Sequence, residues 1–223
     1  MTQKFTILFD LDGTLVHTAP DLMNAHNHVM KKYGFKEKNL TDIKKLAGRG
    51  SKVMLTRSLS DVAQSNEFEN KIDEMTKEFI NYYSNNISNE STLKKGLLNF
   101  LSWCKGKSIQ LGVCTNKQEY LSIDLLKKIK IYHFFEYVAG GDTFKHNKPD
   151  PRHLTDTIEI IGGSVKKTIM IGDSETDSNA SKAANIPFVL IDDGYTEKKS
   201  NEIFHNHLVK DYVGLEKIIE KYL

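Results

Sequence analysis

Acidic residues follow two short apolar runs in the sequence, and these positions are the first candidates for chemistry. The run Phe5–Phe9 is followed by Asp10 and Asp12. A later apolar run is followed by Asp173 and Asp177. Carboxylates gathered in one crevice repel each other unless a cation lies among them or some of them are protonated. Oxygen ligands without a His or Cys partner suit a hard ion, most simply Mg²⁺.

Three further residues would suit a bound phosphate group. Thr115 and Asn116 follow the apolar run Ile109–Cys114, and Lys148 opens the Lys-Pro-Asp-Pro stretch 148–151. A lysine and a threonine hydroxyl beside a magnesium ion can hold phosphate oxygens. Each polar residue taken alone also fits a turn, a helix N-cap or a solvated loop. Their occurrence together after several strands favours a phosphoryl-transfer centre.

The elements that must position these residues are short buried strands separated by helical patterns. The strands are predicted at Phe5–Phe9, Ile109–Cys114, Thr168–Ile171 and Pro187–Ile191, with weaker candidates at Tyr137–Ala139 and His207–Val209. Helices are predicted at Lys95–Lys105, Gln118–Lys128, Arg152–Ile161, Thr176–Ala184 and Tyr212–Tyr222. This alternation indicates βαβ units and a parallel sheet. Because ligands bind at the carboxyl edge of such sheets, we expect the polar residues to meet there.

The interval from about residue 20 to residue 83 contains no convincing strand. Its apolar residues recur at helical spacing, with breaks at Gly34, Gly48–Gly50 and near Ser65–Asn66. A helical module is therefore predicted as an insertion after the first strand, and the polar stretch Ser84–Thr92 is predicted as the return linker. The expected division is a core of residues 1–18 and 85–223 and a helical cap of residues 19–84.

Composition excludes several classes of protein. Lys and Arg total 31 against 29 Asp and Glu, which argues against a dedicated nucleic-acid binder. No apolar run approaches the roughly 20 residues that span a bilayer, and the N-terminal run is too short for a signal-peptide core. We therefore expect a cytoplasmic protein with no membrane or nucleic-acid partner. Cys104 and Cys114 are expected to be buried free thiols.

Four ordered motifs carry a resemblance to the haloacid-dehalogenase superfamily of phosphotransferases. They are Phe9–Leu15, Val113–Lys117, Lys148–Pro149 and Ile171–Asp177. The resemblance extends from Phe5 to about Tyr195 and implies an α/β fold, a Rossmann-like parallel sheet with an inserted α-helical cap. Within the superfamily the chain is most similar to bacterial phosphoglycolate phosphatases, through residues 19–22, 140–143, 148–151 and 193–195. It departs from their pattern at His17, where the family often has Asp.

The resemblance implies roles for the acidic residues. Asp10 would be the nucleophile, and Asp12 would first protonate the leaving group and then activate water. Mg²⁺ would be held by the carboxylates of Asp10 and Asp173 and by the backbone carbonyl of Asp12. Asp177 would support the ion indirectly by orienting a water molecule or a ligand.

The resemblance also implies how the phosphoryl group is held. Thr115 and the backbone of Asn116 would bind its oxygens. Lys148 would offset the charge that Asp10 and the phosphoryl group bring together. Gly13 would permit a tight turn and a close approach to the substrate.

The predicted cap carries basic residues around the Gly48–Gly50 break. They are Lys44, Lys45, Arg49 and Lys52. Arg49 is the best candidate to bind a second negative group of the substrate, such as a carboxylate, whereas the lysines also fit a solvated surface. The pairs His26/His28 and His205/His207 do not share a helix face, so both are predicted as surface or core residues rather than metal ligands.

Together with the motifs, the resemblance implies a Mg²⁺-dependent phosphomonoester hydrolase that acts through an aspartyl phosphate on a small-molecule ester. The expected reaction converts 2-phosphoglycolate to glycolate and phosphate. Alternatives in the same superfamily are a sugar-phosphate phosphatase, a pyrophosphatase or a phosphomutase. A phosphorylatable signalling receiver is the alternative from another class, and a persistent phosphoryl group would distinguish it. The sequence leaves the oligomeric state open.

Overall fold

The computed structural model describes residues 3–60 and 70–223. Its main sheet has six strands in the order β5-β4-β1-β6-β7-β8, and every pair of neighbours is parallel. The strands are β1 (Thr6–Phe9), β4 (Gln110–Cys114), β5 (Tyr137–Ala139), β6 (Thr168–Gly172), β7 (Phe188–Ile191) and β8 (His207–Val209). The four strong strand predictions and both weaker ones are confirmed to within one or two residues, and the two weaker ones form the edges of the sheet.

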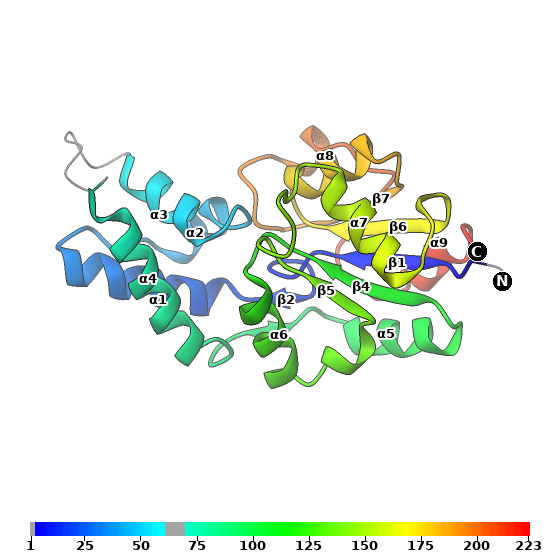
Figure 1. Ribbon diagram of the computed structural model, residues 1–223, viewed down its shortest axis with the longest axis horizontal. Coiled ribbons are helices and arrows are strands. Elements are labelled where there is room, and N and C mark those ends of the chain that lie inside the picture. The colour runs from blue at the N-terminus through cyan, green and yellow to red at the C-terminus, as the bar shows by residue number, and fades with distance from the viewer. Residues whose placement is uncertain (1–2, 61–69) are drawn as a thin grey trace.

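Helices cover both faces of the sheet (Figure 1). They are α5 (Leu97–Gly106), α6 (Glu119–Lys128), α7 (Arg152–Ile161), α8 (Glu175–Ala183) and α9 (Glu216–Ile219). Alternate residues of β1 point to opposite faces: Ile7 and Phe9 pack with α5 and α6, and Leu8 packs with α7 and α8. This two-sided burial explains why the strands are nearly continuous apolar runs.

The last predicted helix, Tyr212–Tyr222, is wrong in its extent. Only Glu216–Ile219 forms α9, and turns lie on either side of it. Gly214 adopts a left-handed conformation at φ 79°, and the Tyr212 amide donates to the carbonyl of Lys95 instead of entering a helix. The apolar spacing that suggested a long helix therefore comes from core residues in an irregular segment.

A helical insertion lies between β1 and β4. It comprises α1 (Ala19–Tyr33), α2 (Leu40–Leu46), α3 (Ser51–Ser60) and α4 (Ile72–Asn85). The predicted break at Gly34 is confirmed, because this glycine ends α1 in a left-handed conformation. Gly48 and Gly50 are also left-handed and separate α2 from α3. The predicted break near Ser65–Asn66 lies outside the described residues.

Two short strands hold the ends of the insertion together. Residues Val16–His17 (β2) pair antiparallel with Thr92–Leu93 (β3), and the amide of Lys94 donates to the carbonyl of Leu15 at 3.0 Å. Sequence analysis did not predict these strands, because two residues are too few for a periodic pattern. In Figure 1 the insertion extends from one end of the sheet and both chain termini lie at the other.

No helix in the described part of the chain is both long and apolar enough to cross a membrane. Cys104 and Cys114 are buried free thiols, as predicted. Burial raises the pKa of each thiol to about 12.

Candidate active site

Three predicted site residues each come directly after a strand of the sheet. Asp10 follows β1, Thr115 follows β4 and Asp173 follows β6. Because β1 lies between β4 and β6, Asp10 stands at the centre of this group. All three side chains are buried. The sheet therefore brings Asp10 together with two residues that each lie more than a hundred positions from it in the sequence.

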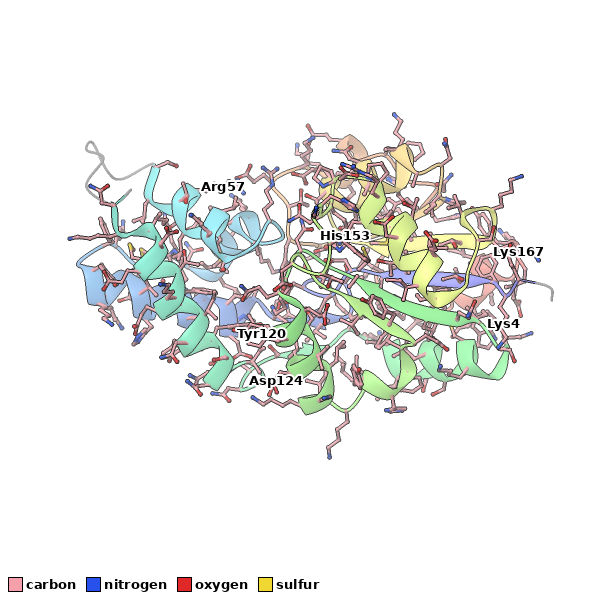
Figure 2. All side chains as sticks on the ribbon, viewed as in Figure 1. Lys4, Arg57, Tyr120, Asp124, His153 and Lys167 are labelled. Carbon is pink, nitrogen blue, oxygen red and sulfur yellow. The ribbon has the colours of Figure 1, made fainter. Side chains whose placement is uncertain are left out.

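Lys148 joins this group from the loop before α7. Its ammonium Nζ lies 2.8 Å from Asp10 Oδ1 and 2.6 Å from Asp177 Oδ1. Burial disfavours the charged lysine, but the charges of Asp10 and Asp177 outweigh burial and raise the pKa of Lys148. The Lys148 amide donates to Nδ1 of buried His153, which fixes the loop against α7. His153, labelled in Figure 2, is the second residue of α7.

Asp10, Asp173 and Asp177 form a buried acidic triad. One oxygen of each carboxylate lies within 4.8 Å of the others. Burial raises the pKa of Asp10 to about 6, although Lys148 opposes this shift. Burial, with the charges of Asp10 and Asp177, raises the pKa of Asp173 well above its ordinary value. These shifts indicate that Lys148 alone does not balance the three carboxylates.

The donor set of the triad fits a hard divalent cation. Both oxygens of Asp177 already accept hydrogen bonds, Oδ1 from Lys148 and Oδ2 from the Ser174 hydroxyl at 2.8 Å. Asp10 Oδ2 has no hydrogen-bond partner among the described residues. Asp10 is therefore better placed than Asp177 to ligate Mg²⁺ directly, and Asp177 is better placed to hold Lys148 and the start of α8.

Gly13 makes room for the Asp173 carboxylate. Its backbone has φ 83°, and a Cβ added to it would lie 2.1 Å from Asp173 Oδ2. The predicted tight turn is present, and the close approach that Gly13 permits in the structure is to Asp173. The Thr14 hydroxyl donates to Asp173 Oδ1 at 3.2 Å, and the Tyr195 amide donates to Oδ2 at 2.6 Å.

A cleft of about 380 Å³ separates the strand ends from the helical insertion. Its core side includes Asp10, Asp12, Thr115, Asn116 and Lys117, and its insertion side includes Leu22, Arg49, Met54, Phe79, Ile80 and Tyr83. The side chain of Asn116 donates to the carbonyls of Gly48 at 3.2 Å and Lys148 at 2.9 Å. If the phosphate of a small ester lay at Asp10, the rest of the ester would therefore face residues of the insertion.

Comparison with known proteins agrees with this arrangement. The model for the haloacid dehalogenase-like hydrolase family matches residues 7–191. The chain belongs to this family. A phosphoglycolate phosphatase of Mesorhizobium japonicum is 35% identical to this hydrolase over 94% of the chain and 92% of the relative. A phosphoglycolate phosphatase of Agrobacterium fabrum is 36% identical over 96% of the chain and 94% of the relative.

Solved structures give the same result. The crystal structure of a predicted phosphoglycolate phosphatase from Haemophilus somnus superimposes with a TM-score of 0.91 and 27% identity, covering 98% of this chain and 99% of the other. A β-phosphoglucomutase from Clostridium difficile has a TM-score of 0.81 and 25% identity, with 98% and 97% covered. This hydrolase is a phosphoric monoester hydrolase with a Rossmann-like α/β core and an α-helical insertion.

Lys117 is a site residue of this hydrolase that sequence analysis missed. Its Nζ lies 2.9 and 2.8 Å from the two oxygens of Asp12, whose Oδ1 also accepts from the Thr18 hydroxyl at 2.7 Å. Lys117 belongs to the quoted Val113–Lys117 motif, but no role was assigned to it. Its position three residues after the end of β4 is the signal that could have identified it.

Arg49 reaches the mouth of the cleft and already has an acidic partner. Its Nη2 lies 2.9 Å from Glu175 Oε1, and the other oxygen of Glu175 accepts from the Thr196 hydroxyl. Lys44 pairs with Asp193 and Lys52 pairs with Asp73. Arg57, labelled in Figure 2, pairs with Glu197 at 2.6 Å. Ion pairs thus connect the insertion to the loop after β7 and to α8.

The histidine pairs lie in ordinary core and surface contacts. Buried His26 contacts the Ser58 hydroxyl through Nε2 at 2.8 Å, and His28 contacts Glu78 at 2.8 Å. His205 contacts the carbonyl of Ile203, and His207 contacts the hydroxyl of Tyr222. These four contacts confirm the interpretation of both pairs as core or surface residues.

Proposed function

We propose that this hydrolase cleaves a small phosphomonoester in two steps through an aspartyl phosphate on Asp10. The observation that carries the proposal is the position of Asp10. This carboxylate lies at the centre of the strand ends, lines the cleft, and keeps Oδ2 free of hydrogen bonds within the described residues while Lys148 holds Oδ1. It is therefore oriented as a nucleophile would be.

The first step forms a bond from Asp10 Oδ2 to phosphorus and breaks the bond from phosphorus to the ester oxygen. The leaving alkoxide takes a proton from Asp12, which lines the same cleft two residues away. In the second step, water attacks the phosphorus of the aspartyl phosphate and gives its proton to Asp12. Inorganic phosphate leaves and the Asp10 carboxylate is restored. Asp12 thus serves as acid and then as base.

The phosphoryl oxygens would be held by groups of the chain around Asp10. The buried Thr115 hydroxyl can donate to one oxygen. The amide side chain of Asn116 is engaged by two carbonyls, which supports a role for its backbone instead. Lys148, paired with Asp10 and Asp177, offsets negative charge that accumulates during transfer.

Magnesium fits the Asp10–Asp173 pair, with the carbonyl of Asp12 as the further ligand that the family resemblance implies. When bound, the ion neutralises charge between the nucleophile and the phosphoryl oxygens. Asp177 holds Lys148 and caps α8 through Ser174. Because Gly13 has no side chain, the Asp173 carboxylate has room to lie beside it and take part in the metal site.

We propose 2-phosphoglycolate as the substrate, in keeping with the names of the curated relatives. Arg49 would leave its partner Glu175 and pair with the substrate carboxylate instead. A phosphomutase activity is the second candidate, since the likeness to β-phosphoglucomutase spans nearly the whole chain. In that case, a sugar hydroxyl in place of water would accept the phosphoryl group. We further propose that residues 19–84 act as a cap over the core formed by residues 1–18 and 85–223.

The test is phosphate release from 2-phosphoglycolate, p-nitrophenyl phosphate, a sugar phosphate and pyrophosphate, with Mg²⁺ and with EDTA. We expect metal-dependent release with 2-phosphoglycolate preferred. Asp10→Asn should lower the rate by at least about 10³-fold, because an amide is a far weaker nucleophile. Asp124→Asn, on α6 and labelled in Figure 2, is the matched control.

Each part of the proposal can fail separately. Substantial turnover by Asp10→Asn would exclude Asp10 as nucleophile. Undiminished release in EDTA would exclude the metal. Preference for another ester would retain the chemistry and reject 2-phosphoglycolate.

A further inference from the structure

The ammonium of Lys117 lies between a carboxylate and an aromatic ring. On one side it contacts both oxygens of Asp12, at 2.9 and 2.8 Å. On the other side it lies 4.5 Å from the centroid of the Tyr83 ring. The side chain of Lys117 is only 6% exposed, so water screens neither contact strongly. The three groups form a continuous chain from the insertion to Asp12.

Tyr83 contributes its ring face to this chain. It lies on α4, is 1% exposed, and stacks on Phe79 one turn earlier with ring centroids 5.8 Å apart. Its hydroxyl has no hydrogen-bond partner among the described residues. Burial raises its pKa, and the charges of Asp12 and Asp21 add to that shift, so the ring remains a neutral phenol. A neutral aromatic face attracts an ammonium group through its quadrupole.

We infer that Tyr83 is a positioning residue for the reaction: its ring holds the Lys117 ammonium against Asp12 and thereby fixes the orientation of the Asp12 carboxylate. This inference rests on the proposed role of Asp12 in proton transfer. Lysine has a long flexible side chain, so its ammonium stays in one place only where its surroundings hold it. Without the ring, the ammonium would lose the contact that holds it on the side away from Asp12, whereas the hydrogen bond from the Thr18 hydroxyl to Asp12 would be unaffected.

The location of Tyr83 gives this contact a further property. Lys117 and Asp12 belong to the segments after β4 and β1, whereas Tyr83 belongs to the insertion. The contact therefore exists only where α4 lies against the strand ends. Alignment of the proposed acid and base is in this way linked to the position of the insertion.

The two proposed steps depend on Asp12 to different degrees, and this difference provides the test. A p-nitrophenolate leaving group is a weak base and departs without a proton. A glycolate alkoxide is a strong base and needs one. The second step needs Asp12 for every substrate, because water must lose a proton. Misalignment of Asp12 should therefore slow aspartyl-phosphate hydrolysis while leaving p-nitrophenolate release fast.

The experiment measures steady-state and rapid-mixing kinetics of Tyr83→Leu with 2-phosphoglycolate and p-nitrophenyl phosphate. We expect kcat to fall about 10–30-fold with both substrates, the range of a desolvated cation–π contact. With p-nitrophenyl phosphate, KM should fall together with kcat, because only the second step slows while kcat/KM reports the first. With 2-phosphoglycolate, KM should not rise, because Tyr83 does not act by binding substrate. A burst of p-nitrophenolate close to one equivalent per enzyme should precede the slow phase.

Three further variants separate positioning from a structural role. Tyr83→Phe retains the ring and should rescue most of the lost kcat. Tyr82→Leu removes the neighbouring aromatic residue, which stacks on His28, and should leave kcat unchanged. Lys117→Met should reproduce the burst even if Tyr83→Leu folds poorly. The double variant should be no slower than Lys117→Met alone, since Tyr83 acts through Lys117.

Several results would overturn the inference. A rise in KM for 2-phosphoglycolate with unchanged kcat would make Tyr83 and Lys117 substrate ligands. A fall in kcat without a burst, or without rescue by Tyr83→Phe, would make Tyr83 merely structural. Full activity of Asp10→Asn would instead reject the proposed function itself, whatever the Tyr83 variants do.

Discussion

The two walls of the cleft are built in different ways. On the core side, Asp10 and Thr115 each stand one residue beyond a buried strand, as does Asp173 beside Asp10, so the backbone of the sheet fixes them. On the insertion side, Arg49 reaches an acidic partner through its long side chain, and Arg57 does the same beside the cleft. The difference teaches that the nucleophile and its neighbours are set by backbone position, whereas the arginines of the insertion are set by ion pairs with distant residues.

The largest expected effect compares one cation from each wall. Lys148→Met should destabilise the fold by about 3 kcal/mol, because it leaves Asp10 and Asp177 buried without their partner. It should also lower phosphate release by at least about 10³-fold. Arg49→Met should change stability by less than about 1 kcal/mol, since Arg49 is 47% exposed. For each variant, urea unfolding measures the stability and phosphate release measures the activity. Equal losses would contradict the comparison.

A pair of glycines sharpens the comparison at the level of the backbone. Gly13→Ala would bring a Cβ to 2.1 Å from Asp173 Oδ2 and should cost about 3 kcal/mol and most of the activity. Gly34→Ala, at the end of α1, meets nothing within 4 Å. It should cost only the left-handed strain of about 1 kcal/mol and keep the activity. Normal turnover by Gly13→Ala would contradict the requirement for a glycine beside Asp173.

The pH dependence of stability tests the burial of His153, which holds the Lys148 loop on the core side. Burial, with the charge of Lys148, lowers the pKa of His153 to about 4 from an ordinary value of 6.5. Below pH 6.5 the unfolded chain therefore binds a proton that the folded chain excludes. This residue should remove about 2 kcal/mol of stability between pH 7 and pH 4.5. Urea unfolding of His153→Asn across this range should show a shallower decline, and an unchanged decline would argue against the burial of His153.

The smallest effect is expected from the ion pair that joins α3 to the loop after β7. Arg57→Met removes the partner of Glu197, which is more than half exposed. The free energy of unfolding should fall by less than about 1 kcal/mol, and added salt should weaken the effect. Thermal unfolding at low and high salt provides the measurement. A loss as large as that of Lys148→Met would show that the two walls do not differ as described.

The sequence predicts the core wall better than the insertion wall for a physical reason. A buried parallel strand is an apolar run, and the residue after it lies at the ligand-binding edge whatever its partners are. This reasoning placed Asp10 and Asp173 together although 163 residues separate them. The partner of Arg49 could not be inferred in this way, because Glu175 is one of 29 acidic residues and nothing local selects it.

The elements and residues that sequence analysis missed depend on contacts between distant parts of the chain. Lys117 is one of many lysines, and its partners Asp12 and Tyr83 are distant in sequence. The segment at Tyr212 shows helical spacing, but its apolar residues fill the core beside α5 from an irregular backbone. Strands β2 and β3 are defined only by their pairing with each other. Each miss depends on a contact that sequence periodicity does not encode.

The pairing of β2 with β3 has a consequence for the architecture of the chain. Because the chain leaves and rejoins the core through adjacent antiparallel strands, the insertion is topologically a long hairpin loop. Its length and content can change without altering the order of strands in the sheet. The closure of so long a loop costs little more than that of a short one, since the entropy grows only with the logarithm of length. The insertion is thus a module whose size can vary as long as the contacts that reach the strand ends, such as that of Tyr83 with Lys117, are kept.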